Sequence, residues 1–121
     1  MASLLQLSDS VVVHAFELRP DVTVIGRHSD CDICIKQPSV SSFHALIRAR
    51  PGELGDGAAD YEISDTNSTN GTFVNGERLN EPRLLNHGDH VRVGWHHFRF
   101  VEEDEDTLDM TSHMADTQPD I

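Results

Sequence analysis

The sequence predicts a small all-β protein, an antiparallel β-sandwich of short strands followed by an acidic tail. Short runs of β-branched and aromatic residues alternate with period two between turn residues, as at 90–93 and 98–101. No stretch before residue 101 has a helical period of apolar residues. The 121 residues provide for one domain with a modest hydrophobic core. Many short strands with closely spaced turns are typical of a sandwich or barrel.

Eleven segments carry this strand pattern. They span residues 3–7, 11–18, 22–25, 32–35, 43–47, 61–64, 72–74, 77–79, 83–85, 90–93 and 98–101. Neither face of 11–18 is consistently polar, so we expect both faces to be partly covered. In 43–47 the apolar residues Phe43, Ala45 and Ile47 alternate, which predicts a half-buried strand. The Gly-rich stretch 48–60 breaks every period and is predicted to be a hairpin loop.

A polar stretch at 64–76 contains two Asn-Gly pairs, Asn70-Gly71 and Asn75-Gly76. Both residue types accept positive φ, so each pair marks a tight turn. The second pair lies between two short strands and predicts a hairpin. The first pair follows hydroxyl and amide side chains at 66–69, which are too polar for a core. On a loop held by strands, these groups either offer donors to an anionic or peptide ligand or form an ordinary polar connection.

Two further polar clusters lie next to predicted strands. Gly26-Arg27 ends the strand 22–25. The planar, permanently charged guanidinium of Arg27 can bind a phosphate or carboxylate, or it can form an ordinary surface salt bridge. Ser41 and Ser42 stand at the entrance of 43–47. His44 follows Ser41 by three residues, and we expect it to brace the serine loop through backbone hydrogen bonds rather than to act in catalysis.

The charge is unevenly distributed along the chain. The formal net charge is −12, and eight of the 21 acids lie from Glu102 onward, where Lys and Arg are absent. Residues 102–121 are therefore expected to form a disordered acidic tail, separate from a domain over 1–101. A clustered basic face is missing, so we expect no nucleic-acid partner. With no membrane-length apolar run and no signal peptide, we expect a cytoplasmic protein, or a nuclear one in a eukaryote, that does not bind membranes.

The cysteines and the histidines near the C-terminal end of the domain are candidates for a metal or redox site. Cys31 and Cys34 form one C-x-x-C without the second pair that zinc needs, and are interpreted as small buried or half-buried strand residues. Four histidines also lack a spacing that fixes tetrahedral geometry and are interpreted as solvated loop residues: His87, His90, His96 and His97. We expect no metal and no cofactor.

Four motifs together give the chain a family resemblance. They are Ile25-Gly26-Arg27, the S-x-x-H of 41–44, the S-x-N-G-T-x-V-N-G of 68–76 and the G-D-x-V-x-x-G of 88–94. In this order and spacing the chain is similar to the forkhead-associated (FHA) domain family, from about Leu4 to Val101. The resemblance implies a β-sandwich whose loops at one end bind phosphothreonine in partner proteins.

The resemblance also implies roles for individual residues. Arg27 would meet the phosphate, Ser41 and Thr69 would donate hydroxyls to it, and Asn70 would hold the peptide backbone. Ser42 stands where the family often has Arg or another polar residue, so a second cation is lost here. Three residues would be structural supports of these loops: Gly26, His44 and Gly71.

The function that follows is a non-enzymatic adaptor in Ser/Thr kinase signalling that binds threonine-phosphorylated proteins. The alternative is a phosphate-independent scaffold on the same fold. A hydrolase using His44 with Ser41 is disfavoured, because the sequence has no nucleophile elbow and no orienting acid at a recognisable spacing. The tail holds Thr107, Thr111 and Thr117. Self-association through one of these threonines, once phosphorylated, is a further hypothesis, set against a tail that only solubilises or links.

Overall fold

The computed structural model describes residues 2–51 and 59–102, which form strands joined by turns and loops. The strands are β1 (Ala2–Ser8), β2 (Val11–Glu17), β3 (Val22–Gly26), β4 (Ile33–Cys34), β5 (Ala45–Pro51), β6 (Ala59–Asp65), β7 (Thr72–Val74), β8 (Glu77–Arg78), β9 (Arg83–Leu84), β10 (His90–Val93) and β11 (His96–Glu102). These two ranges contain no helix, and thus none that could cross a bilayer.

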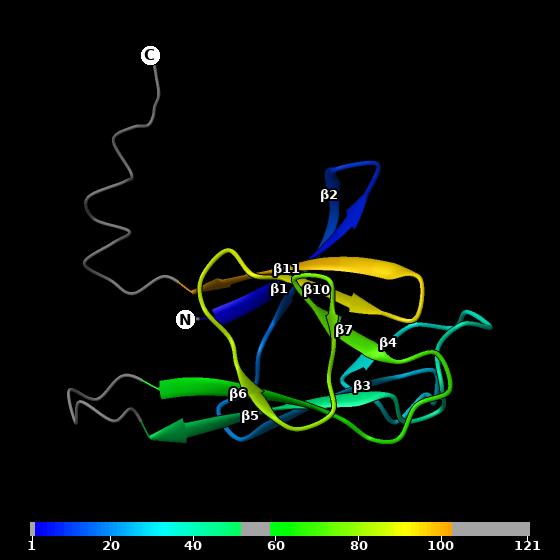
Figure 1. The fold of residues 1–121 in the computed structure, drawn as a ribbon. Helices are drawn as coiled ribbons and strands as arrows, with labels where there is room; N and C mark the ends of the chain where they lie inside the picture. The colour runs from blue at the N-terminus through cyan, green and yellow to red at the C-terminus, as the bar shows by residue number, and fades with distance from the viewer. Residues whose placement is uncertain (1, 52–58, 103–121) are drawn as a thin grey trace, which may run out of the picture.

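The strands form two sheets that face each other (Figure 1). One sheet has the order β2-β1-β11-β10-β7-β8, and the other has the order β4-β3-β5-β6-β9. Neighbouring strands pair antiparallel, except that β3 and β4 run parallel. The all-β sandwich predicted from the sequence is confirmed.

The core lies between the sheets and follows the period-two alternation of the strands. In β11, Phe98 and Phe100 are fully buried, whereas the preceding residue of each, His97 and Arg99, is exposed. Aliphatic residues of both sheets pack around these rings: Leu4, Ile25, Ile33, Ile47, Ile63, Val74, Val91 and Val93. Burial of each large side chain stabilises the fold by roughly 1.5–3 kcal/mol, so this cluster holds the sheets in register.

The second Asn-Gly pair forms the predicted hairpin turn between β7 and β8. Asn75 and Gly76 have φ angles of 52° and 85°. Positive φ at both central residues gives the backbone a twist that matches the flanking strands. The side chain of Asn75 is also fixed, because its Nδ2 donates to Asp89 and its Oδ1 accepts from the backbone N–H of His90.

Two predicted boundaries differ from the structure. The loop expected over 48–60 is shorter, because β5 runs to Pro51 and β6 begins at Ala59, with cross-strand pairing between those two residues. The composition of this stretch did not indicate that residues 48–51 and 59–62 continue the hydrogen-bonded pairing of β5 with β6. At the other end, β11 includes Glu102. Residues 103–121, with the three tail threonines, lie outside the described residues, so the predictions for the tail stay predictions.

The expectation that both faces of β2 are partly covered holds only at Phe16, which is partly buried and packs against the core. Val11, Val12 and Val13 are 61%, 51% and 48% exposed. β2 is the outermost strand of its sheet and pairs only with β1 among the described strands. Figure 1 shows the β1–β2 hairpin turned away from the five-stranded sheet, which explains the exposure of the three valines.

Candidate functional site

Three loops meet at one end of the sandwich, and each carries one of the polar clusters. They connect β3 to β4, β4 to β5, and β6 to β7. The N–H of Arg27 donates to the carbonyl of Ser41 at 2.9 Å, and the N–H of His28 donates to that of Ser42 at 3.0 Å. The first two loops therefore run side by side, with Arg27 next to both serines.

The third loop is joined to the second by side-chain hydrogen bonds. The backbone N–H of Thr69 donates to Ser41 Oγ at 3.1 Å, and Asn70 Nδ2 donates to the carbonyl of Ser39 at 2.9 Å. Ser39 in turn accepts the N–H of Trp95 on its Oγ. The five residues predicted to bind ligand are thus brought together from three separate segments: Arg27, Ser41, Ser42, Thr69 and Asn70.

Several donors at this site have no acceptor within the described part of the chain. The guanidinium of Arg27 makes no hydrogen bond or ion pair there, and the hydroxyls of Ser42 and Thr69 donate to nothing. Arg27, Ser42 and Thr69 are all exposed. A fixed cation beside hydroxyl donors is an arrangement that binds an oxyanion through charge-assisted hydrogen bonds.

His44 connects the second and third loops from beneath. It is fully buried, and its Nδ1 accepts the backbone N–H of Ser41 at 3.0 Å. Because Nδ1 is the acceptor, Nε2 carries the proton and donates to the carbonyl of Gly71 at 2.8 Å. The ring bonds to the backbone of Ser41 and not to its hydroxyl, so within residues 2–51 and 59–102 His44 is not paired as a base with a serine nucleophile.

Gly26 is required because the backbone of the next loop lies directly on it. A Cβ at this position would stand 2.2 Å from the carbonyl oxygen of Ser42 and 2.9 Å from Cys31 Sγ. The backbone carbonyl of Ser42 cannot yield without moving the whole loop. The close approach of these two segments sets the spacing between Arg27 and the serines.

Replacing Gly26 by Ala should therefore displace the serine loop. We expect a loss of stability of about 1–3 kcal/mol from overpacking, together with weaker ligand binding. Urea denaturation measures the first effect, and titration of the site's ligand measures the second. Ser29→Ala, at an exposed position of the neighbouring loop, is the control and should change neither. A stable Gly26→Ala protein with unchanged binding would show that this contact does not set the site.

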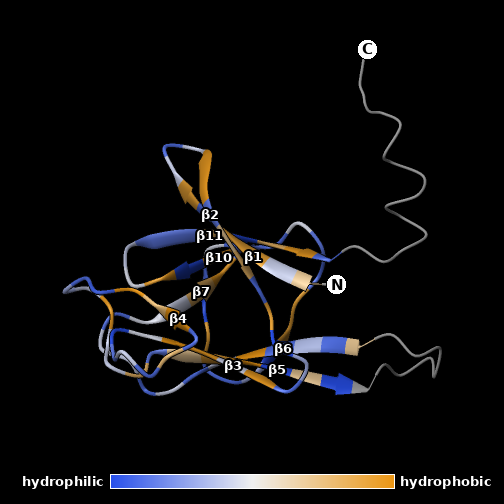
Figure 2. Ribbon diagram, turned by 180° about the vertical axis from the view of Figure 1, so that it is seen from behind, coloured by the Kyte–Doolittle hydropathy of each residue, from blue (hydrophilic) through white to orange (hydrophobic). Residues whose placement is uncertain are grey.

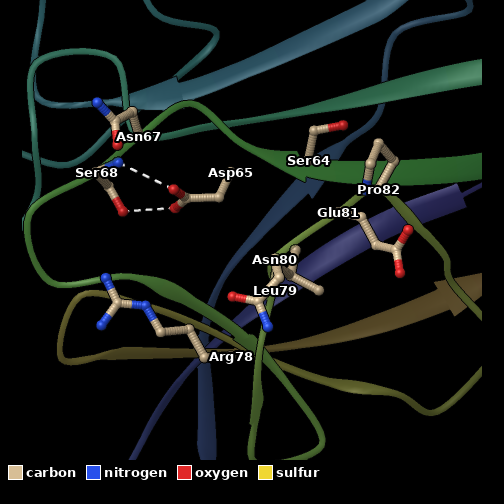
Figure 3. Close-up of a pocket in the computed structure, with 9 residues that line it drawn as sticks. All are labelled: Ser64, Asp65, Asn67, Ser68, Arg78, Leu79, Asn80, Glu81 and Pro82. Atoms are coloured by element: carbon tan, nitrogen blue, oxygen red, sulfur yellow. Dashed lines mark hydrogen bonds between the residues drawn. The ribbon is translucent and has the colours of Figure 1, made fainter.

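The carboxylate of Asp65 organises the third loop from its start. It accepts the N–H and the hydroxyl of Ser68 (Figure 3). It also accepts the hydroxyl of Thr72 at 2.7 Å. Ser68 Oγ extends this hydrogen-bond network, because it also accepts the N–H of Gly71 at 3.0 Å. Sequence reasoning missed Asp65, although an Asp three residues before a Ser is a known signal for a side-chain turn.

Burial alone would raise the pKa of Asp65, but the hydrogen bonds from Ser68 and Thr72 outweigh it and hold this pKa below the usual value of an aspartate. A carboxyl whose pKa is depressed on folding stabilises the fold fully above its unfolded pKa, and this contribution is lost as the pH falls through the folded pKa. Asp65→Asn should lower stability at neutral pH and flatten its decline below about pH 4. Urea midpoints between pH 7 and pH 2 test this; equal slopes for both proteins would contradict it.

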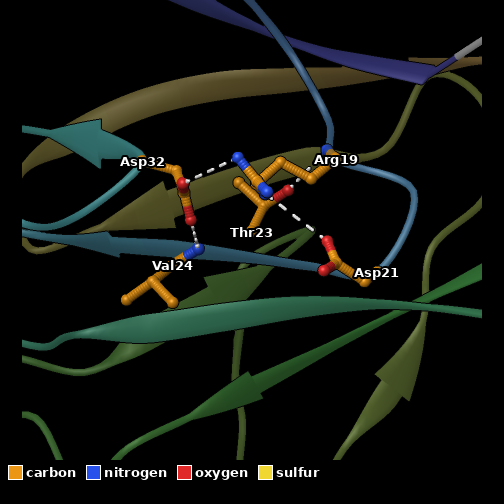
Figure 4. A network of polar contacts seen from close by, with 5 residues as sticks. All are labelled: Arg19, Asp21, Thr23, Val24 and Asp32. Carbon is orange, nitrogen blue, oxygen red and sulfur yellow. Dashed lines mark hydrogen bonds and ion pairs between the residues drawn. The ribbon is translucent and has the colours of Figure 1, made fainter.

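The first loop is held to β3 by a second acidic residue (Figure 4). Asp32 Oδ2 accepts the backbone N–H of Val24 at 2.8 Å, and its Oδ1 lies 3.7 Å from Arg19 NH1. Arg19 also contacts Asp21 at 3.4 Å. Each of these surface ion pairs contributes little to stability. The hydrogen bond to Val24 holds the end of the loop that follows Arg27 against β3.

Two cysteines and one aromatic residue also lie against the site. Cys31 is buried and Cys34 half-buried, as predicted, and burial raises the pKa of the Cys31 thiol. Their sulfurs lie 3.3 Å from the carbonyl of Ser42 and 3.6 Å from that of Arg27.

The prediction that Phe43 faces the core is wrong. It precedes β5, is 50% exposed and stacks on His28, because the sharp turn into His44 breaks the strand alternation.

Of the four late histidines, His87 is an exposed turn residue, as predicted. The prediction is wrong for the other three, which lie in strands β10 and β11: His90, His96 and His97. His90 Nε2 lies 2.9 Å from His97 Nδ1, and burial and the neighbouring His97 lower the pKa of His90. No three metal-ligating side chains gather anywhere in 2–51 and 59–102.

The FHA domain model matches residues 23–94, which is more than half of the chain and includes all three loops. The chain belongs to the FHA domain family. The resemblance drawn from the sequence motifs is thereby confirmed. FHA domains are in general interaction modules without enzymatic activity.

Two curated relatives and two solved FHA structures are similar to this domain. The transcriptional regulatory protein EmbR of Mycobacterium tuberculosis is 36% identical over 94 residues, covering 78% of this chain and 22% of EmbR. The oxoglutarate dehydrogenase inhibitor of Corynebacterium jeikeium is 40% identical over 86 residues, covering 71% of this chain and 53% of the inhibitor. The chain therefore spans between about a fifth and a half of these relatives.

The solved structures superpose on most of the described domain. EmbR of Mycobacterium tuberculosis in complex with a low-affinity phosphopeptide has a TM-score of 0.69 at 34% identity, covering 83% of this chain and 24% of EmbR. An FHA domain solved in a study of phosphothreonine-dependent interactions has a TM-score of 0.71 at 27% identity, covering 85% and 97% of the two chains.

A hollow of about 450 Å³ adjoins the third loop of this FHA domain (Figure 3). Its lining combines the loop residues Asn67 and Ser68 with Arg78 and with the segment from Leu79 to Pro82. A Cβ on Gly71, whose φ is +86°, would lie 2.9 Å from Arg78 Nε. Arg78 therefore lies beside Gly71, but its flexible side chain can yield to an added Cβ, so Gly71 is needed for its backbone angle.

Proposed function

We propose that this FHA domain binds phosphothreonine peptides through the three loops and acts as an adaptor for threonine-phosphorylated proteins. The observation that carries the proposal is the convergence of Arg27, Ser42 and Thr69, whose guanidinium and hydroxyl groups donate to no acceptor among the described residues. A phosphate of charge near −2 needs one fixed cation and several aimed donors. EmbR, solved with a phosphopeptide, and the FHA domain from the study of phosphothreonine-dependent interactions support this ligand class.

Each predicted residue has a role in this proposal. Arg27 contacts two phosphate oxygens as a bidentate fork, and the hydroxyls of Ser41 and Thr69 donate to the others. Ser41 Oγ accepts from the Thr69 N–H and so keeps its own proton for the phosphate. Asn70, anchored through its Nδ2 to Ser39, holds the peptide backbone with its remaining carbonyl oxygen.

Ser42 distinguishes this site from family members with a basic residue at the same position. Its hydroxyl supplies one neutral donor in place of a second cation. A hydroxyl gives the phosphate a single hydrogen bond without an opposite charge, whereas a guanidinium adds both a full positive charge and a bidentate pair of donors. Ser42→Arg should therefore tighten phosphopeptide binding by up to about tenfold, measured by isothermal titration. Unchanged affinity would place Ser42 outside the phosphate's reach.

The alternative function is a scaffold that binds partners without phosphate. The absence of a second cation at Ser42 favours it, because the phosphate site is weaker without that charge. The two functions predict different contact surfaces. Titration of the ¹⁵N-labelled domain with a degenerate phosphothreonine peptide set should shift the amide signals of 27–28, 41–44 and 66–71. Shifts confined to other strands, equal with unphosphorylated peptides, would favour the scaffold.

A further inference from the structure

Two arginines lie on the outer face of the six-stranded sheet, next to the third loop. Arg92 of β10 stands opposite Phe73 of β7, and Phe73 stands opposite Arg78 of β8. The residues on either side of Arg92 and of Phe73 along their strands are buried, so these three residues share the face that is turned away from the core. Figure 2 shows hydrophilic residues on β10 and on the neighbouring β11 of this sheet.

Stacking on aromatic rings holds the Arg92 guanidinium in place. Its Cζ lies 3.9 Å from the centroid of the Phe73 ring and 5.2 Å from that of Trp95, which is 62% exposed. A stacked guanidinium uses its face for the ring and keeps the N–H groups along its edge for a carboxylate or phosphate. Within residues 2–51 and 59–102, neither Arg92 nor Arg78 donates a side-chain hydrogen bond or forms an ion pair.

The acids that lie near Arg78 do not cancel its charge. Glu77, its neighbour on β8, is paired with Arg83 at 2.9 Å. The carboxylate of Asp65 accepts hydrogen bonds within the third loop. No ion pair joins Arg78 to Glu81, another described residue that lines the hollow. In a chain whose net charge is −12, the two arginines therefore place a local positive charge on this face.

An arginine cluster thus adjoins the loop residue Asn70, and it consists of four residues: Phe73, Arg78, Arg92 and Trp95. A Cβ on Gly71, the residue after Asn70, would lie 2.9 Å from Arg78 Nε and 3.1 Å from Phe73 Cε1. Asn70 and Trp95 are both anchored to Ser39, the first through its side-chain amide and the second through its backbone N–H. The cluster is therefore continuous with the loop to which the proposed function assigns the peptide backbone.

We propose that the arginine cluster binds an acidic side chain of the same peptide whose phosphothreonine occupies the three loops. Such binding rests on the proposed function and defines the class of phosphopeptide that the domain prefers. Arg92, fixed by its aromatic neighbours, binds the carboxylate through a bidentate pair of hydrogen bonds, and Arg78 adds a second positive charge. A phosphothreonine among neutral or basic residues lacks this contact, so the cluster selects among phosphorylated partners.

Isothermal titration of the full chain with matched peptides tests this preference. The reference peptide carries phosphothreonine between neutral residues, with Gln at each scanned position. In the test series one Gln at a time, on either side of the phosphothreonine, is replaced by Glu. At the position that reaches the cluster, Glu should tighten binding by about threefold to tenfold, and added salt should reduce this gain because it screens exposed charges.

Substitutions in the cluster should change this gain in affinity from Gln to Glu. The double variant Arg78→Gln/Arg92→Gln should bind both peptides equally, whereas Arg99→Gln, a change on the same face of the neighbouring β11, should keep the full gain. Arg78→Glu, at an exposed position, should reverse the sign of the effect and favour Lys over Gln.

Two results would overturn the proposal. One is equal binding of the Glu and Gln peptides by the wild type at every scanned position. The other is a gain that persists in the double variant. Failure of every phosphothreonine peptide to bind, the reference included, would refute the proposed function and this preference with it.

Discussion

Replacing Arg27 by Ala should abolish phosphate-dependent peptide binding while leaving the fold intact. The guanidinium is exposed and makes no hydrogen bond or ion pair within the described residues, so its removal leaves no buried group unpaired. Two charge-assisted hydrogen bonds to a phosphate contribute roughly 1.5–3 kcal/mol each. Their loss lowers affinity by at least about a hundredfold, which isothermal titration with a phosphothreonine peptide measures.

Two variants define the origin of this loss. Arg27→Lys keeps the charge but replaces the planar fork by a point charge, so it should recover only part of the affinity. Arg48→Ala removes an exposed Arg on β5 and should have no effect. Retention of phosphopeptide binding in Arg27→Ala would remove Arg27 from the site and favour the phosphate-independent scaffold.

Replacing His44 by Ala should cost the largest amount of stability of any single change at the site. The ring is fully buried and bonds to the backbone of Ser41 and Gly71 at 3.0 and 2.8 Å. Without it, a backbone N–H and a carbonyl lose their partners, at about 1–3 kcal/mol each, and a cavity is left. We expect a loss of about 3–5 kcal/mol, a large share of the stability of a small domain.

Thermal denaturation followed by circular dichroism measures this loss, and the fall in Tm should be about 12 °C or more. His28→Ala removes an exposed ring of the neighbouring loop and serves as the matched control. Where the His44→Ala domain remains folded at low temperature, its phosphopeptide affinity should also fall, because the second and third loops are no longer joined. A Tm within a few degrees of the wild type would mean that His44 does not brace the loops.

The local pattern of the sequence was enough to predict the strands and one turn. Period-two alternation of apolar residues predicted which side chains of β10 and β11 face the core, namely Val91 and Val93 and then Phe98 and Phe100. Asn75-Gly76 predicted a hairpin because few residue pairs accept positive φ at two consecutive positions, and the structure has both angles positive. These features depend on neighbouring residues only, which is why they could be read without a structure.

The exposure of β2 could not be predicted, because it depends on what lies across from a strand. An apolar segment such as Val11–Glu17 is typical of a covered strand, yet its place at the sheet edge leaves its three valines exposed. Phe43 shows the same limit on a smaller scale. Its alternation with Ala45 predicted a strand, whereas the turn that places His44 under the loops sends Phe43 to the surface.

The candidate site was only partly visible in the sequence. The residues that carry charge or hydroxyls were found because the motifs place them beside strand ends. Asp65 was missed although its hydrogen bonds to Ser68 and Thr72 are local. Ser39 was missed because it accepts hydrogen bonds from Asn70 and Trp95, which lie 31 and 56 residues away. Such long-range pairing follows from the sheet topology and has no local signal.

Fluorescence anisotropy with three matched sets of degenerate peptides tests the central claim most directly. The sets carry phosphothreonine, phosphoserine or unmodified threonine at the fixed position and are titrated with the wild-type domain. We predict saturable binding of the phosphothreonine set, much weaker binding of the phosphoserine set, which lacks the γ-methyl group, and none of the unmodified set. Equal binding of the phosphorylated and unmodified sets, or binding of none, would contradict phosphothreonine recognition at the Arg27 loop.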